Sequence, residues 1–179
     1  MNVVTFNQRS VAEILQMIRM LGGLVGCQDA AVRLADDLGR GLERIREAAV
    51  AIPARPRVFF EEWDDPLISG IQWVEELVEI AGGEPIFPEL RGAKMGKDRI
   101  VDPAEVIRRN PEVIIGSWCG KPVRKKAIAA RPGWAEVTAV RRGAISEVKS
   151  AYILQPGPAA LTEGVQQLHK IIAAAASAR

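Results

Sequence analysis

Hydrophobic and polar residues follow two different rhythms along this chain, and the change falls near residue 53. Before it, apolar residues recur every three to four positions, which is typical of amphipathic helices. This spacing predicts one helix that begins at a Ser10–Glu13 capping box and a longer one over about 29–50. The run NVVTFN (2–7) is typical of a strand, and Pro53 and Pro56 close the helical segment.

From residue 57 onward, short apolar runs alternate with helical periods. Strands are expected over RVFFE (57–61), EVIIGSW (112–118) and AEVTAV (135–140), with an edge strand over ISEVK (145–149). Helices are expected over about 69–81, from Asp102 as N-cap, over 122–130 and over 159–176. The alternation indicates an α/β fold with a mostly parallel sheet flanked by helices.

Candidate ligand-binding residues gather where the predicted strands end. In open parallel sheets, ligands bind beyond the carboxyl ends of the strands. EEWDDP (61–66) and SWCGKP (117–122) lie at two such ends, and SAYILQPGP (150–158) follows the last strand. These segments contribute Trp63, Asp64, Asp65, Trp118 and Tyr152 as candidates.

The acidic segment 61–65 has several interpretations. Paired carboxylates serve as general acid and base, and oxygen ligands suit Mg²⁺ or Ca²⁺, but no further ligand cluster accompanies them. A binding-cleft lip is favoured because a tryptophan stands among the carboxylates. The enzyme alternative is a small α/β hydrolase or transferase that uses residues 61–65. Trp118 is a candidate either for ligand stacking or for the core.

Composition excludes several other classes. Charged residues make up 26% of the chain, hydrophobic residues 48%, and the net charge is +2. No helix has a one-sided basic stripe, so no nucleic-acid partner is expected. Cys27 and Cys119 form neither a metal motif nor a disulfide framework, and the sole histidine, His169, is an improbable catalytic base. We expect no catalytic residues, no metal site and no resident cofactor.

The chain from residue 57 onward resembles the C-terminal lobe of the ABC-importer substrate-binding proteins for cobalamin, haem and iron–siderophore complexes. ELVEIAGGEPIF (76–87), followed by VDPAEVIRRNPEVII (101–115), is the most specific part; RPGWAEVTAVRRGAISEVKS and LQPGPAALTEGVQQLHKII continue the resemblance. It implies a remnant strand of the N-terminal lobe over 1–7, a helical inter-lobe backbone over 8–52 and a Rossmann-like ligand-binding lobe over 53–179.

This resemblance also implies a partner, a location and a missing part. By comparison with the family, we expect this sequence to lack the N-terminal lobe and an export signal. Members of the family are extracytoplasmic, whereas the sequence as it stands, with no signal peptide, indicates a cytoplasmic protein if it is the complete gene product. Glu105 matches the glutamate that docks onto the transporter's membrane subunits in the cobalamin-binding relative. If NVVTFN lacks its sheet neighbours, we expect it to pair with a second copy through residues 2–6.

The ligand class is predicted from the chemistry of the lip. An acidic, aromatic lip favours cobalamin or a related corrinoid, whose ring is edged with neutral amides. A loop expected to be mobile contains four basic residues, Arg91, Lys94, Lys97 and Arg99. Because basic side chains bind anions, an anionic ferric siderophore is the alternative ligand. Arg99 is included among the candidate ligand-binding residues on this ground.

Overall fold

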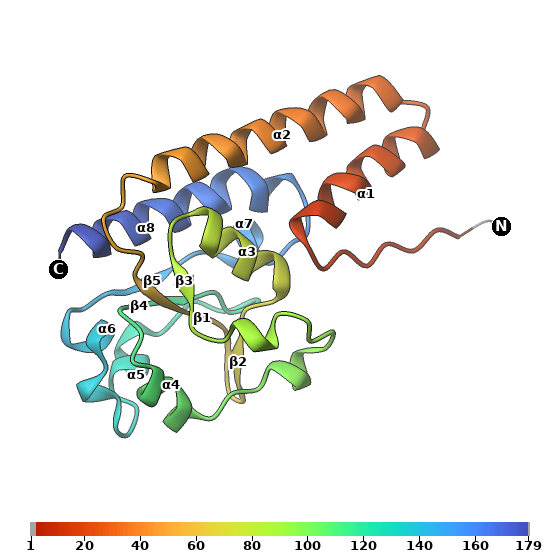
Figure 1. Ribbon diagram of the computed structural model, residues 1–179. Coiled ribbons are helices and arrows are strands. Elements are labelled where there is room, and N and C mark those ends of the chain that lie inside the picture. The colour runs from red at the N-terminus through yellow and green to blue at the C-terminus, as the bar shows by residue number, and fades with distance from the viewer. Residues whose placement is uncertain (1–2, 179) are drawn as a thin grey trace.

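The structure, a computed structural model, describes residues 3–178 and contains one five-stranded sheet (Figure 1). The strand order is β2–β1–β4–β5, and β3 pairs with the start of β1. The strands are β1 (Arg57–Asp64), β2 (Leu67–Ser69), β3 (Glu84–Pro85), β4 (Val113–Gly116) and β5 (Ile145–Glu147). β1 is parallel to β3 and β4, β4 is parallel to β5, and only β2 is antiparallel to its neighbour. The predicted α/β fold is confirmed.

Helices cover both faces of this sheet (Figure 1). One face carries α1 (Val11–Leu24), α2 (Gln28–Ala49), α3 (Gln72–Ile80), α7 (Ser150–Ile153) and α8 (Val165–Ser177), the last preceded by a π-helical turn (Ala160–Gly164). The other carries α4 (Pro103–Arg109), α5 (Lys125–Ala129) and α6 (Thr138–Arg141). Short 3₁₀ turns occupy Pro88–Leu90, Gly96–Arg99 and Trp134–Glu136.

Helix ends follow the local chemistry predicted from sequence. The hydroxyl of Ser10 accepts from the Glu13 N–H at 3.1 Å, and the Glu13 carboxylate accepts from the Ser10 N–H at 3.1 Å. The side chain of Asp102 accepts from the Ala104 N–H at 2.8 Å. These bonds satisfy backbone donors that a helix start otherwise leaves free, so α1 and α4 begin where expected.

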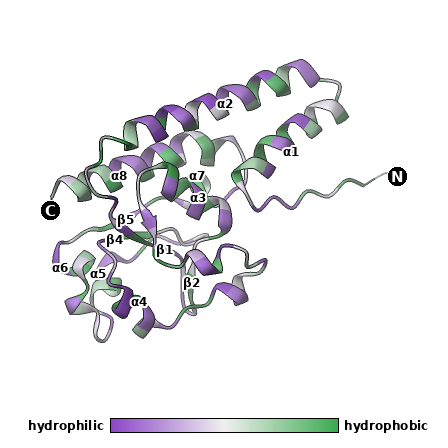
Figure 2. Cartoon of the chain, viewed as in Figure 1, coloured by the Kyte–Doolittle hydropathy of each residue, from purple (hydrophilic) through white to green (hydrophobic). Residues whose placement is uncertain are grey.

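The helical segment and the α/β lobe share one hydrophobic core. Ile14 and Ile18 of α1 and Leu38 of α2 belong to the same buried cluster as Val74 of α3 and Ile115 of β4. Figure 2 shows that α2 carries both polar and apolar residues, as an amphipathic cover requires. The secondary structure changes near residue 53, while this buried cluster contains residues from both sides of that position. No helix within residues 3–178 is long and apolar enough to cross a membrane.

Two predicted strands are wrong where the structure describes them. Residues 3–9 extend away from α1 and form no strand, and Val3 is 72% exposed (Figure 1). Residue 2, which the prediction also included, lies outside the described residues. Residues 135–140 form a 3₁₀ turn and α6. Most of their backbone bonds are local helical bonds, for example from the Val140 N–H to the Val137 carbonyl at 2.9 Å, whereas the Ala139 N–H donates to the Pro111 carbonyl at 3.0 Å. A short β-branched run alone cannot distinguish such a helical turn from a strand.

Candidate functional site

The predicted acidic loop is mostly strand. β1 continues to Asp64 and turns back into β2, with Trp63 opposite Ile68 and Asp64 opposite Leu67. The pairing register shifts between Glu61 and Trp63, so the strand bulges at this end of the sheet. Sequence reasoning missed β2 because three residues between Pro66 and Gly70 are too few to show the alternation typical of a strand. The hairpin projects the aromatic and acidic side chains from a paired backbone.

Three of the four carboxylates in this hairpin are held by basic side chains. Glu61 is fully buried and accepts two hydrogen bonds from Arg131, at 2.6 and 2.9 Å. Glu62 accepts from Arg99 at 2.7 and 3.0 Å. The third, Asp64, lies 2.5 Å from the Lys121 ammonium. The hairpin is therefore no cluster of free carboxylates, and residues 3–178 contain no group of acidic, histidine and cysteine side chains that could hold a metal ion.

The pKa values of two of these carboxyls move in opposite directions. Burial raises the pKa of Glu61, and the Arg131 and Trp118 hydrogen bonds oppose that rise. Burial also acts on Asp64, but the Lys121 hydrogen bond and the Lys121 and Arg124 charges outweigh it, so the pKa of Asp64 lies below its ordinary value. Asp64 therefore remains ionised and paired at the edge of the sheet.

Lys121 brings two of the predicted segments together. Its ammonium lies 3.9 Å from the centre of the Trp63 ring and 5.1 Å from that of Trp118. Because β1 and β4 are parallel neighbours, their carboxyl ends place EEWDDP and SWCGKP side by side, as predicted. The sequence analysis did not select Lys121, although its place in SWCGKP, directly after a strand, was the available signal.

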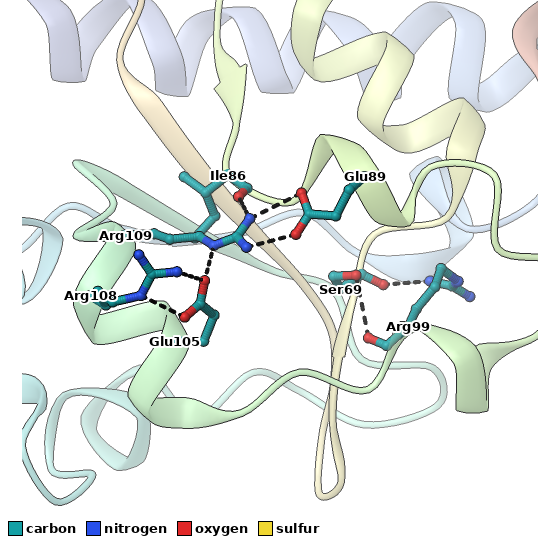
Figure 3. Close-up of polar contacts among 7 residues, drawn as sticks. All are labelled: Ser69, Ile86, Glu89, Arg99, Glu105, Arg108 and Arg109. Atoms are coloured by element: carbon teal, nitrogen blue, oxygen red, sulfur yellow. Dashed lines mark hydrogen bonds and ion pairs between the residues drawn. The ribbon is translucent and has the colours of Figure 1, made fainter.

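Trp118 and Arg99 support the lip from behind. Both are only 2% exposed, which corrects the expectation that their side chains face a ligand. The Trp118 indole donates to Glu61 at 3.0 Å, so of its two predicted roles this tryptophan has the one in the core. Arg99 also bonds both ways with Ser69, and Figure 3 shows it reaching back to β2. Since Arg99 binds Glu62 and Ser69, it ties the loop predicted to be mobile to the hairpin.

Asp65 and Tyr152 are the more accessible candidates. Asp65 is exposed at the turn, and its carbonyl accepts from the Trp63 indole at 2.8 Å. Tyr152 lies on α7, after the carboxyl end of β5, and is 40% exposed. Both are thus placed at the same edge of the sheet as Trp63. Cys119, in the segment that follows β4, is exposed and, like Cys27, has a free thiol.

Glu105 lies on a separate surface, within an ionic cluster at the start of α4 (Figure 3). Its carboxylate accepts from Arg108 at 2.8 Å and from Arg109 at 2.5 Å. Arg109 also pairs with Glu89 at 2.7 Å and stacks over Phe87. The hydrogen bonds from Arg108 and Arg109 lower the pKa of Glu105 to about 2. The Glu105 carboxylate is thus held by two arginines of its own helix.

Comparison with known proteins defines the class. The sequence model of the family described as "Periplasmic binding protein" matches residues 1–152, and the chain belongs to this family. The family is one of solute-binding proteins, which agrees with the expected absence of a catalytic role. The family therefore does not support the hydrolase or transferase interpretation of residues 61–65.

Particular relatives show how much of the family's length is represented. The chain is 26% identical over 176 residues to the uncharacterized ABC transporter substrate-binding lipoprotein YvrC of Bacillus subtilis. The matched region covers 95% of this chain and 53% of that protein. A possible iron-binding protein of Staphylococcus epidermidis has a similar fold (TM-score 0.81, 22% identity, 96% of this chain and 66% of that one). The vitamin B12 binding protein BtuF of Vibrio cholerae also has a similar fold (TM-score 0.74, 22% identity, 97% of this chain and 66% of that one). The chain spans about half the length of the curated relative.

Proposed function

We propose that this chain captures a metal chelate, in the first place a corrinoid, for an ABC importer. The observation that carries the proposal is the meeting of EEWDDP and SWCGKP at the carboxyl edge of the sheet, where Lys121 joins Trp63 to Asp64. In open α/β sheets this edge is where ligands bind. Trp63, Asp65 and Tyr152 supply the contacting side chains, and Asp64 acts through Lys121.

The proposed preference for a corrinoid rests on an aromatic side chain and not on the acidity of the lip. An acidic lip favoured a corrinoid from sequence, but the ion pairs of Glu61, Glu62 and Asp64 neutralise most of that acidity. A half-buried tryptophan remains, and its face suits a broad planar ring. An iron chelate, either a siderophore or haem, is the second candidate, because a protein of similar fold is described as possibly iron-binding.

We further propose that the surface around Glu105 docks onto the membrane subunits of the transporter, and that the protein works outside the cytoplasm, as its family description implies. Glu105 is partly exposed at the beginning of α4, and Arg108 beside it has a mostly exposed side chain (72%). A partner arginine would compete with Arg108 for the Glu105 carboxylate.

Calorimetric titration with cyanocobalamin, beside a ferric hydroxamate, tests ligand capture. Trp63→Ala is expected to weaken the binding of the preferred chelate by about 30-fold, since buried aromatic anchors contribute about 2 kcal/mol or more. Leu34→Ala, a similar truncation on the exposed side of α2, serves as the control. Equal affinity of the Trp63→Ala and unaltered chains would contradict the assignment of the site, and failure of both chelates to bind at millimolar concentration would contradict ligand capture by this chain.

A further inference from the structure

A small pocket opens beside Lys121, between the segment after β4 and the segment after β5. It has a volume of about 310 Å³, and its walls include Trp118, Lys121, Pro122, Glu147, Lys149 and Ser150. Pockets for whole drug-sized ligands span roughly 300–1,000 Å³. This one is at the small end of that range, so it suits one side arm of a larger ligand whose ring lies over the lip.

The polar groups in this pocket include an acceptor that is held in place. The Val123 N–H donates to Oε1 of Glu147 at 3.3 Å. The other oxygen of Glu147, the Lys149 ammonium and the Ser150 hydroxyl have no hydrogen-bond partner among residues 3–178. The pocket therefore offers one carboxylate acceptor and two donors to whatever enters it.

The charges around the pocket and the lip balance. Lys121 and Arg124 are both close to Asp64, at 2.5 and 3.7 Å. Lys149 and Glu147 both line the pocket, and Asp65 adds one more negative charge at the hairpin turn. Three cations thus face three anions. An anionic chelate would find no excess positive charge, and burying its carboxylate beside Glu147 would be unfavourable.

We propose that this pocket binds a neutral primary carboxamide arm of the ligand. Glu147 accepts a hydrogen bond from the amide N–H₂, while Lys149 and Ser150 donate to the amide oxygen. Pro122 contacts the methylene groups of the arm. This inference rests on the proposed chelate-binding function and specifies the ligand class: a macrocycle edged with amides rather than with carboxylates.

The Glu147→Gln variant makes a sharp test because the Val123 N–H still requires an oxygen acceptor. With its oxygen turned to Val123, the glutamine directs its NH₂ group into the pocket and replaces an acceptor by a donor. The probes are cyanocobalamin and its monocarboxylic acids, in each of which one peripheral propionamide is hydrolysed, titrated separately into the ¹⁵N-labelled chain at pH 7. Glu136→Gln removes the same charge from an exposed position and is the matched control.

The unaltered chain is expected to bind cyanocobalamin about tenfold more tightly than one of the monocarboxylic acids, and Glu147→Gln is expected to reverse that preference. The Ser150 and Val123 amide signals should shift on binding. An unchanged preference in Glu147→Gln, or equal affinity of the unaltered chain for cyanocobalamin and every acid, would overturn the inference. Binding of the ferric hydroxamate alone would overturn it while leaving chelate capture intact. If no chelate binds, both fall.

Discussion

Glu75 predicts an unusual dependence of stability on pH. This carboxyl lies on α3 and is only 4% exposed. Burial raises its pKa from 4.5 to about 8; the charges of Arg91 and Arg99 and a hydrogen bond from the Gly70 N–H oppose the rise, and the charge of Glu79 adds to it. The folded chain therefore keeps a proton that the unfolded chain releases above pH 4.5.

The sign and size of the effect follow from this difference. A raised pKa stabilises the fold fully below pH 4.5, and that contribution is lost progressively as pH rises toward 8. Each pH unit in this window costs about 1.4 kcal/mol, so about 3 kcal/mol is lost by pH 7. Glu75→Gln keeps the shape and the neutral state of the side chain. We expect it to raise the free energy of unfolding by about 3 kcal/mol at pH 7 and to leave it nearly unchanged at pH 4.5.

Urea unfolding monitored by tryptophan fluorescence at pH 4.5, 6, 7 and 8 measures this difference, with Trp73 two residues away as a reporter. Glu136→Gln removes a carboxylate from an exposed position and should shift the curve little at any pH. A difference between Glu75→Gln and the unaltered chain that stays constant from pH 4.5 to 8 would refute the reasoning, because it would show that the carboxyl ionises as freely in the fold as in the unfolded chain.

Three other predictions concern separate parts of the molecule. Arg131→Met leaves Glu61 buried without its partner and should lower the free energy of unfolding by about 3–5 kcal/mol, whereas adding Glu61→Gln should restore part of it in the same urea assay. The Glu105 carboxyl should titrate near pH 2 by NMR and nearer its ordinary 4.5 in Arg108→Ala; an unchanged value would exclude that pair as the cause. Dimerisation through residues 2–6 stays a prediction, and a monodisperse monomer by light scattering at high micromolar concentration would contradict it.

The sequence predicted the secondary structure best where a local signal coincided with a buried face. The capping box at Ser10, the N-cap at Asp102 and the apolar run of β4 all carry their own chemistry, and all three elements form there. AEVTAV was predicted wrongly because a short run of apolar and β-branched residues is compatible with both a strand and a helical turn. In the structure its backbone bonds are mostly the local bonds of a helical turn.

The candidate site was predicted in outline but not in detail. The strand ends indicated which segments meet, since that depends on topology alone. Which side chains face outward depends on ion pairs between segments about 40 to 70 residues apart: Arg99 with Glu62 and Arg131 with Glu61. Nothing in the neighbourhood of EEWDDP reveals these arginines. The sequence analysis therefore overestimated the negative charge of the lip and did not include Lys121 among the candidate residues.

The shared core beneath α1 and α2 has a mechanical consequence. Ile14, Leu38 and Ile115 pack in one cluster, so swinging the helical hairpin away from the sheet would expose apolar surface all along the cluster at once. A hinge needs a boundary that few contacts cross, whereas α2 packs along α3 and α8, the helices that cover this face of the sheet. The helices and the lip should therefore travel as a single rigid piece.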